Sequence, residues 1–371
     1  MKYNQNQSIP ILYYHSVADH KEKDNWSFLS IQIELFKKQM NYLHKNGFST
    51  CTWDELYDHI NGLKKITKKS VMIHFDDGFL DNWTIVFPIM KKLSFHYSIL
   101  LTPEFIQEGE IRPFTDQSNL LQKHQWWGYL NKKEIKKMSE SGLVDFQAHG
   151  FTHTWYESSS RLIDIYNGSN FYPHIHWNLN SEKKPYWLNT KLNVKLGYPI
   201  FEFKKSLELN NRFILKQNVV NELIKIYDKT KTDQENFKSY QNLLNEKKLN
   251  EKIGYFETDV QSNKRLLMEL RTTKKYIEGI TNKPVNYLVF PGGGNSDRVY
   301  KLSEKVGYKL VSKGNELNYF NSKVFRVTRF SAFYPFPSIF YKTLNMIFLK
   351  LQISRAHGNP IIKILIKLLR K

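Results

Sequence analysis

Two adjacent aspartates in this sequence stand where a buried strand is expected to end. Asp76 and Asp77 follow the mainly apolar run 71–75 and precede Gly78. Because neighbouring side chains on an ideal strand point to opposite faces, at least one carboxylate must lie on the turn that Gly78 allows. One aspartate could then hold a cation while the other acts as a base. An ordinary loop turn is the alternative interpretation of the same residues.

Histidines supply the other candidate groups. His149 and His153 are four residues apart with Gly150 between them, and such a pair can converge on one ion from a turn or a helix. His15 follows the apolar run 9–14. Chance spacing among the 12 histidines, and a structural role for His15, are the alternatives. Two histidines and one aspartate leave coordination positions open on a metal, as a hydrolytic site requires.

The elements that would position these groups alternate between strand and helix patterns. Strands are expected at residues 9–14, 48–52, 71–75, 97–101 and 143–148, and helices at 31–46, 53–60, 82–93 and 131–141. The alternation breaks between about 155 and 252, then resumes with a helix at 261–279, a strand at 286–290, a helix at 297–306 and a strand at 309–312. This pattern predicts an α/β fold with a parallel sheet or barrel, whose strand C-termini are where sites are built.

The candidate groups belong to short motifs that resemble those of one protein family. In chain order the motifs are Leu12-Tyr-Tyr-His15, Phe75-Asp-Asp-Gly78, His149-x-x-x-His153 and Phe290-Pro-Gly-Gly293. They resemble the polysaccharide deacetylase family, with its NodB-homology domain, and their layout is most similar to poly-N-acetylglucosamine deacetylases. The resemblance covers residues 9–154 and about 262–330. It implies a distorted (β/α) barrel of the polysaccharide deacetylase type with a large insertion.

The resemblance also implies a role for each matching side chain. Asp77, His149 and His153 would bind a divalent metal, usually zinc. Asp76 would be the general base. His15 would be the general acid, because its position matches the N-terminal Tyr-His of the subfamily that includes poly-N-acetylglucosamine deacetylases.

One family feature is missing from the sequence. The third motif of the family usually carries an arginine that orients the base, but Phe290-Pro291 stands in its place. Arg326 and Arg329 are candidate substitutes. The function implied is hydrolysis of an N-acetyl or other N-acyl group on an amino sugar, in a polysaccharide, an oligosaccharide or a lipid-linked glycan precursor. The missing arginine leaves open a non-catalytic glycan-binding protein on the same fold.

Composition narrows the classes of protein further. The chain has 371 residues, 41% of them hydrophobic, which excludes wholesale disorder. Its single cysteine, Cys51, excludes an intrachain disulfide and a cysteine-based zinc cluster. The net charge of +20 suggests an anionic partner, although a solvated lysine surface explains it as well. The lysines are spread along the chain without a recognised module, so a nucleic-acid-binding protein is the least favoured alternative.

The C-terminal residues differ from the rest. No acidic residue follows Glu316 in the last 55 positions, and residues 336–371 hold seven Lys or Arg. In the second of two expected helices, 338–353 and 360–371, one side carries Ile361, Ile364, Leu365, Leu368 and Leu369, and the other carries Lys363, Lys367 and Arg370. This pattern is typical of a helix in a membrane interface, and a helix docked on the barrel is the alternative.

The organisation expected from these features is a catalytic domain over residues 1–335, interrupted by an insertion at about 156–255, and a basic helical tail over 336–371. No run of 18 uncharged apolar residues predicts a membrane span. The apolar run 9–14 is too short for a signal segment. We therefore expect a cytoplasmic protein, peripheral on the inner face of the cytoplasmic membrane if the tail binds lipid.

Overall fold

The computed structural model describes residues 8–19, 27–114, 128–190, 193–209, 211–250, 253–336 and 340–370. The chain divides into two compact units. The first unit comprises Met1–Phe151, Thr272–Gly293 and Gly307–Lys371. The second comprises Thr152–Arg271 and Gly294–Val306. Residues 156–255, where an insertion was expected, fall within the second unit.

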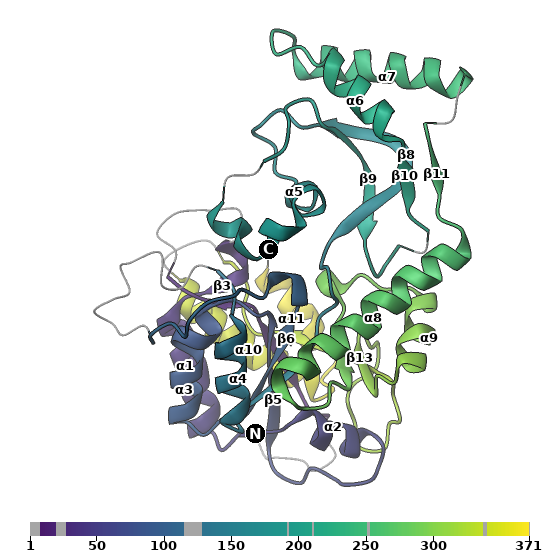
Figure 1. Cartoon of the computed structure of the whole chain (residues 1–371). Helices are drawn as coiled ribbons and strands as arrows, with labels where there is room; N and C mark the ends of the chain where they lie inside the picture. Colours follow the sequence, from purple (N-terminus) through teal and green to yellow (C-terminus); the bar gives the residue numbers. More distant parts are fainter. Residues whose placement is uncertain are drawn as a thin grey trace. The chain divides into compact units, whose positions relative to one another are not determined.

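The first unit is built on one nine-stranded sheet (Figure 1). Its strands are β1 (Ile11–Tyr14), β4 (Ser49–Thr50), β5 (Ser70–Asp77), β6 (Tyr97–Leu101), β7 (Val144–Ala148), β12 (Tyr287–Leu288), β13 (Leu310–Ser312), β14 (Arg326–Val327) and β15 (Phe330–Ser331). The order is β14-β13-β12-β7-β6-β5-β1-β15, and β4 also pairs with β5. Every pair in the sheet is parallel. All the carboxyl ends of the strands therefore meet at one edge of the sheet.

The two edge strands show that this sheet is curled. β14 and β15 lie at opposite ends of the strand order, yet only Thr328 and Arg329 separate them in the sequence. A link of two residues spans at most about 11 Å, so the two edges must approach each other. The sheet is therefore a half-barrel, in agreement with the parallel α/β barrel that the sequence predicted.

The helices of the first unit follow the apolar spacing of the sequence. Up to Phe151 the described helices are α1 (Ile33–Lys45), α2 (Trp53–Ile60), α3 (Phe87–Lys92) and α4 (Lys132–Glu140). α2 and α4 each begin with a capping box, made by Thr52 with Glu55 and by Asn131 with Glu134. Such caps satisfy backbone N–H groups that a first helical turn leaves unpaired. The helix expected at 82–93 divides into a π-turn at Asn82–Val86 and α3.

Short segments complete the path of the chain through the first unit. β2 (Ser16–Val17) and β3 (Ser30–Ile31) form a separate parallel pair, and single 3-10 turns occupy Ser27–Leu29, Pro103–Phe105 and Pro291–Gly293. All eight residues of β5 are buried, so the strand that ends in the two aspartates runs through the core. In the core next to β5, Trp53 stacks on Tyr287, and the centroids of the two rings are 4.7 Å apart.

The second unit has a different architecture. β8 (Trp155–Ile165) pairs antiparallel with β9 (Pro199–Lys205), and β10 (Phe213–Leu215) pairs antiparallel with β11 (Gly254–Phe256). Its helical segments are α5 (Pro173–Leu179), a 3-10 segment at Ser181–Asn189, α6 (Gln217–Ile226), α7 (Asp233–Asn250) and α9 (Asp297–Val306). α8 (Asp259–Thr281) begins in this unit and ends in the first. Antiparallel pairs explain why the strand–helix rhythm is absent from this part of the sequence.

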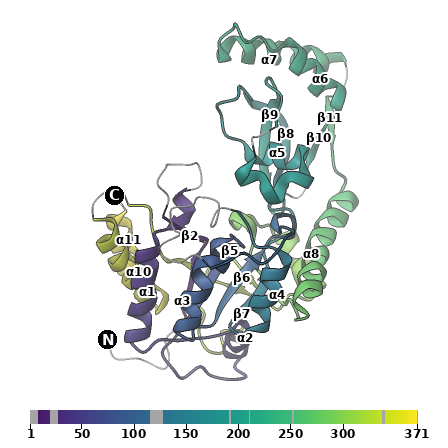
Figure 2. The same ribbon diagram turned by 60° about the vertical axis from the view of Figure 1, so that its left-hand side comes forward.

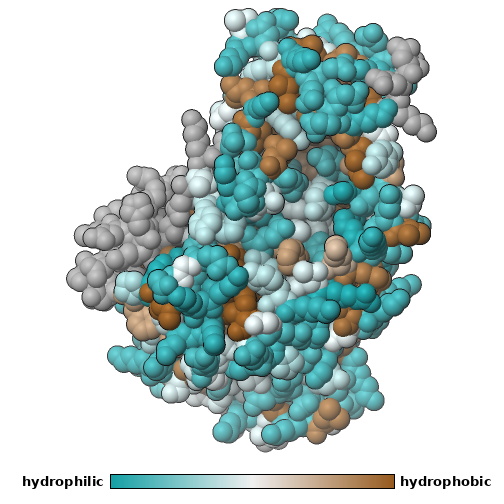
Figure 3. Space-filling model, in the orientation of Figure 1, coloured by the Kyte–Doolittle hydropathy of each residue, from teal (hydrophilic) through white to brown (hydrophobic). Residues whose placement is uncertain are grey.

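The C-terminal residues of the first unit form a pair of helices. α10 (Tyr341–Ala356) packs on α1 and β15, and α11 (Ile362–Leu369) packs on α10. Figure 2 shows α1, α10 and α11 side by side. Among the described residues no helix is long and apolar enough to cross a membrane. Hydrophilic residues cover most of the face of the molecule drawn in Figure 3.

Candidate active site

Asp76 and Asp77 are both buried at the carboxyl end of β5. The backbone of Asp77 has a φ of 72°, in the left-handed region that non-glycine residues rarely adopt, and Gly78 follows with a φ of 73°. A Cβ on Gly78 would lie 2.8 Å from Cδ2 of Leu101, so glycine is required there for space as well as conformation. Because two successive residues have a positive φ, the chain leaves the extended conformation here. The two carboxylates therefore need not point to opposite faces, as they would on an ideal strand. Strained backbone of this kind gathers at functional sites.

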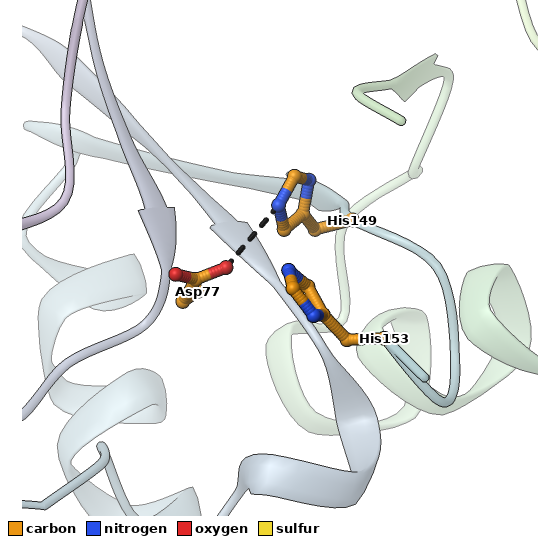
Figure 4. A group of neighbouring side chains, drawn as sticks. All are labelled: Asp77, His149 and His153. Atoms are coloured by element: carbon orange, nitrogen blue, oxygen red, sulfur yellow. Dashed lines mark ion pairs between the residues drawn. The ribbon is translucent and has the colours of Figure 1, made fainter. Parts of the chain in front are cut away.

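The structure brings together the three expected metal ligands, Asp77, His149 and His153. One ligand atom from each lies within 4.8 Å of the others (Figure 4). His149 follows β7, the strand two places from β5, and its Nε2 lies 3.2 Å from Oδ1 of Asp77. His153 follows on the same loop, with a φ of 47°. Like Asp77, it has the left-handed backbone conformation.

A hydrogen bond fixes the orientation of His149. Its Nδ1 lies 2.8 Å from the carbonyl oxygen of Val289. Because a carbonyl oxygen can only accept, Nδ1 carries a proton, and Nε2 is the ring atom that faces Asp77. Although burial lowers the pKa of His149, the Asp76 and Asp77 carboxylates raise it above its ordinary value. An Nδ1–H held by a backbone carbonyl, with Nε2 as the ligand atom, is the arrangement found for histidines that bind metals.

These donor atoms fit a divalent transition metal. Two imidazole nitrogens and one carboxylate oxygen are the ligands of open zinc sites, in which further positions are left for water or substrate. The donor set is mixed rather than all-oxygen, which does not suit magnesium or calcium. The three residues could therefore hold a zinc-like ion.

Asp76 has a different partner. Nη1 and Nη2 of Arg329 donate to its two oxygens at 2.7 and 2.9 Å. Burial alone would raise the pKa of Asp76, but the Arg329 guanidinium, with His149 and His15, lowers the pKa to about 2. The paired oxygens hold the carboxylate in one plane, and the ion pair keeps it charged.

The arginine absent from the third motif thus has a substitute from another strand. Arg329 lies between β14 and β15, where the two edges of the sheet meet. Its guanidinium carbon also lies 4.7 Å from the ring centroid of Tyr13 on β1. Of the two candidates, Arg329 makes the contact with Asp76, while Arg326 is exposed on β14. Sequence reasoning gave Tyr13 no role, although its place beside His15 in the first motif was a signal.

His15 also lies close to Asp76. Its Nε2 is 3.9 Å from Oδ2 of Asp76. Burial lowers the pKa of His15; the Asp77 and Asp76 carboxylates offset part of this effect, and His149 and Arg329 add to it. The imidazole is therefore neutral at neutral pH in the free protein.

The backbone of His15 is tied to the turn after β5. Nδ2 of Asn82 donates to the carbonyl oxygen of His15 at 3.0 Å and to Oδ1 of Asp81 at 2.8 Å. Asp81 in turn accepts from Oγ of Ser16 at 2.5 Å and from the N–H of Val17 at 3.0 Å. Burial raises the pKa of Asp81 to about 7. This network fixes the end of β1, and with it His15, against the segment that carries the aspartates.

A cavity of about 500 Å³ opens beside these groups. The first unit supplies its whole lining: Tyr13, His15, Asp76, Phe290, Gly292, Gly293, Ser312, Lys313, Gly314, Asn315, Thr328 and Arg329. Lys313 has a φ of 71°, and its side chain fills the space that a Cβ on Gly293 would need. The third-motif loop and the end of β13 therefore form part of the wall of the cavity that Asp76 also lines. Lys313 was not among the residues singled out in the sequence.

The fold and this site define a class of protein, and comparison with known proteins agrees. Residues 64–170 match the sequence model of the family described as polysaccharide deacetylase. That range includes Asp76, Asp77, His149 and His153. The resemblance that the motifs suggested is therefore confirmed. The catalytic and metal-binding roles of the individual residues stay predictions.

Particular relatives have names in the same class. Over 145 residues, 39% of this chain, the sequence is 28% identical to the Bacillus subtilis protein YxkH, whose name places it provisionally among polysaccharide deacetylases. Over 197 residues, 49% of the chain, it is 21% identical to the poly-beta-1,6-N-acetyl-D-glucosamine N-deacetylase of Escherichia coli. These matches cover 43% and 28% of the relatives, so the chain matches less than half the length of either.

A solved structure extends the likeness in fold over most of the chain. The de-N-acetylase from Aggregatibacter actinomycetemcomitans superposes with a TM-score of 0.54, covering 86% of this chain and 93% of its own. The sequences are 15% identical, so this likeness shows the fold alone.

Proposed function

We propose that the protein is a metal-dependent hydrolase that removes an N-acetyl, or another N-acyl, group from an amino sugar. The substrate would be part of a polysaccharide, an oligosaccharide or a lipid-linked glycan precursor. One observation carries the proposal: Asp77, His149 and His153 converge on one point beside Asp76, which Arg329 holds in place. The family match and the names of the relatives support the same class of reaction.

Asp77, His149 and His153 would hold the ion, with zinc the metal that their donor atoms suit best. When bound, such an ion polarises an amide carbonyl and makes water a better nucleophile near neutral pH. The His149 Nδ1–H bond to Val289 would keep Nε2 in its binding direction while substrate enters and leaves.

Asp76 would take a proton from the attacking water. A carboxylate with a pKa of about 2 is a weak base, and once protonated it gives its proton away readily. Nε2 of His15 is 3.9 Å from Oδ2 of Asp76, about 1 Å beyond hydrogen-bonding distance. A small movement or one bridging water would join them.

His15 would then return the proton to the leaving nitrogen. Burial keeps its imidazole neutral, so it can receive the proton from Asp76 and then act as an acid. Water adds to the carbonyl carbon, the C–N bond breaks, and the proton passes to the amine. The products are a free amino sugar and the carboxylic acid, acetate in the case of an N-acetyl group.

The cavity suits a sugar ring. Its volume of about 500 Å³ lies in the range of pockets for small ligands. Two hydroxyl groups that line the cavity make hydrogen bonds within the protein. The hydroxyl of Ser312 accepts from the N–H of Phe290, and that of Thr328 donates to the carbonyl oxygens of Gly314 and Glu316. Lys313 and Asn315 lie on the same wall as polar side chains for the sugar.

The test is acetate release by the zinc-loaded protein from acetylated amino-sugar oligomers, among them β-1,6-linked N-acetylglucosamine, with the mass loss of the glycan as a second readout. We expect Asp76→Asn to abolish nearly all turnover while zinc content stays equal to that of the wild type. Turnover retained in Asp76→Asn would contradict the base assignment. Glycan binding without release of any acyl group by the wild type would replace the hydrolase with a glycan-binding protein.

A further inference from the structure

The last helix of the chain is docked by a narrow face. Ile362 and Ile366 of α11 are buried in a cluster with Phe336 and Phe348. The guanidinium carbon of Arg370 lies 4.9 Å from the ring centroid of Tyr334. These contacts hold α11 against α10 and the segment before it. The docking expected as the alternative for this helix is therefore present, but it uses the face that Ile362 and Ile366 form.

A second apolar face of the same helix has no cover among the described residues. Ile361, Ile364, Leu365 and Leu368 are exposed by 65%, 63%, 43% and 59%. At 100° per residue they occupy an arc of about 100°, centred about 130° from the two buried isoleucines. Leu369, which the sequence pattern grouped with them, lies against the buried cluster instead. Four large aliphatic side chains thus face outward from a helix that is already anchored.

The charged side chains of residues 336–371 all have one sign. Lys363 and Lys367 are exposed on the remaining side of α11, between the apolar arc and the buried face. The nearest acidic residue in the sequence is Glu316, and residues 336–371 hold seven basic residues. A lysine stem can lie along an apolar surface while its ammonium reaches outward. A partner surface is therefore complementary to this face if it has an apolar layer for the aliphatic side chains and negative charges for the lysines.

We propose that the exposed face of α11 docks on an anionic lipid surface. Ile361, Ile364, Leu365 and Leu368 would enter the boundary between headgroups and acyl chains, and Lys363 and Lys367 would pair with lipid phosphates. The buried face would remain on α10, so the catalytic unit would be carried to the membrane by a rigid contact. The proposal does not depend on the hydrolase function.

The experiment is sedimentation of the full chain with vesicles of phosphatidylcholine alone or of phosphatidylcholine with phosphatidylglycerol. We expect binding to the anionic vesicles only. Lys363→Gln with Lys367→Gln should weaken it about 25-fold, since each basic residue near an anionic leaflet contributes about fivefold. Ile364→Asn with Leu368→Asn should weaken it at least about tenfold, because two aliphatic side chains no longer enter the lipid.

Matched variants elsewhere in the first unit serve as controls. Leu63→Asn changes an aliphatic side chain that is 70% exposed, and Lys91→Gln with Lys92→Gln removes two exposed charges. Neither control should change sedimentation. Circular dichroism establishes that each variant is folded, and if the apolar pair does not fold, the lysine pair still tests the proposal.

Three results would overturn it. Equal binding to neutral vesicles would show that anionic lipid is not required. Equal weakening by the control variants would show that binding does not depend on α11. Absence of binding to any vesicle would contradict the whole proposal. If, in that case, ultracentrifugation shows a dimer that Ile364→Asn with Leu368→Asn dissociates, the face is a contact between copies of this chain.

Discussion

Replacing Arg329 by glutamine tests the contact on which the base depends. Asp76 is buried and Arg329 is largely buried, with exposed side-chain fractions of 4% and 12%. Glutamine removes the charge and one of the two donors. The Asp76 carboxylate would then be left buried beside only the two histidines, His15 and His149.

The magnitude follows from the pKa of Asp76. Arg329 and the histidines hold it at about 2 instead of 3.8, and each pKa unit corresponds to about 1.4 kcal/mol. The pair therefore stabilises the folded protein by about 2 kcal/mol at neutral pH. Because the pKa is depressed, this stability is present above pH 3.8 and is lost as the pH falls through about 2. Removing one partner of a buried pair costs somewhat more, about 3 kcal/mol, because an unpaired buried charge remains.

Two assays separate stability from chemistry. Urea unfolding of the chelator-treated protein measures the loss of about 3 kcal/mol. Acetate release by the zinc-loaded enzyme measures kcat/KM, which we expect to fall about 100-fold because the base is no longer held in place. The acidic limb of its pH profile should move to higher pH in Arg329→Gln, since burial, which raises the pKa of Asp76, is then opposed only by His149 and His15. A purely structural role for Arg329 would leave that limb in place.

Arg326→Gln is the matched control, because Arg326 is exposed on the neighbouring strand. It should change neither stability nor the pH profile. Arg329→Lys keeps the charge without the two-pronged contact, and we expect intermediate activity. The reasoning is refuted if Arg329→Gln retains the wild-type pH profile and zinc-dependent rate, or if Arg326→Gln matches its effect.

Three further predictions concern the turn, the cavity and the opposite end of the sheet. Gly78→Ala should destabilise the fold by about 2 kcal/mol more than Gly142→Ala, as measured by urea unfolding, because both glycines have φ near 72° but only the Cβ at Gly78 meets another side chain; equal losses would contradict this. Lys313→Ala should raise KM for amino-sugar oligomers more than it lowers kcat, since Lys313 lines the cavity and is given no part in the proton transfers; a fall in kcat alone would refute it. Burial raises the pKa of Asp145 from 3.8 to about 6, so between pH 4 and pH 7 the wild type should lose up to about 3 kcal/mol more stability than Asp145→Asn; parallel pH curves would exclude this effect.

Local sequence was sufficient for much of the first unit. The apolar spacing placed α2 at residues 53–60 and β6 at 97–101, with the bounds that the structure has. Such elements are predictable because a helix or strand with one buried face carries a period of its own. The order of the motifs along the chain also indicated the family before any fold was known.

Other features left no local pattern. β14 and β15 have two residues each, too few to show a period, so the closure of the sheet was not predictable. The second unit was recognised only by the loss of strand–helix alternation. On α11 the sequence pattern grouped five aliphatic residues on one side. In the structure the helix instead buries Ile362 and Ile366 against its neighbours, and Leu369 is partly buried with them. A helix with apolar residues on two sides does not specify which side is buried.

The sequence by itself determined which side chains can do chemistry: two aspartates at the end of one strand and a pair of histidines four residues apart. The tertiary structure decided which of them meet, and it supplied the missing arginine. Arg329 reaches Asp76 across 253 positions of sequence because the sheet curls until its two edges lie a few residues apart. No spacing rule can encode such a contact, since it depends on how nine strands close together rather than on neighbours along the chain.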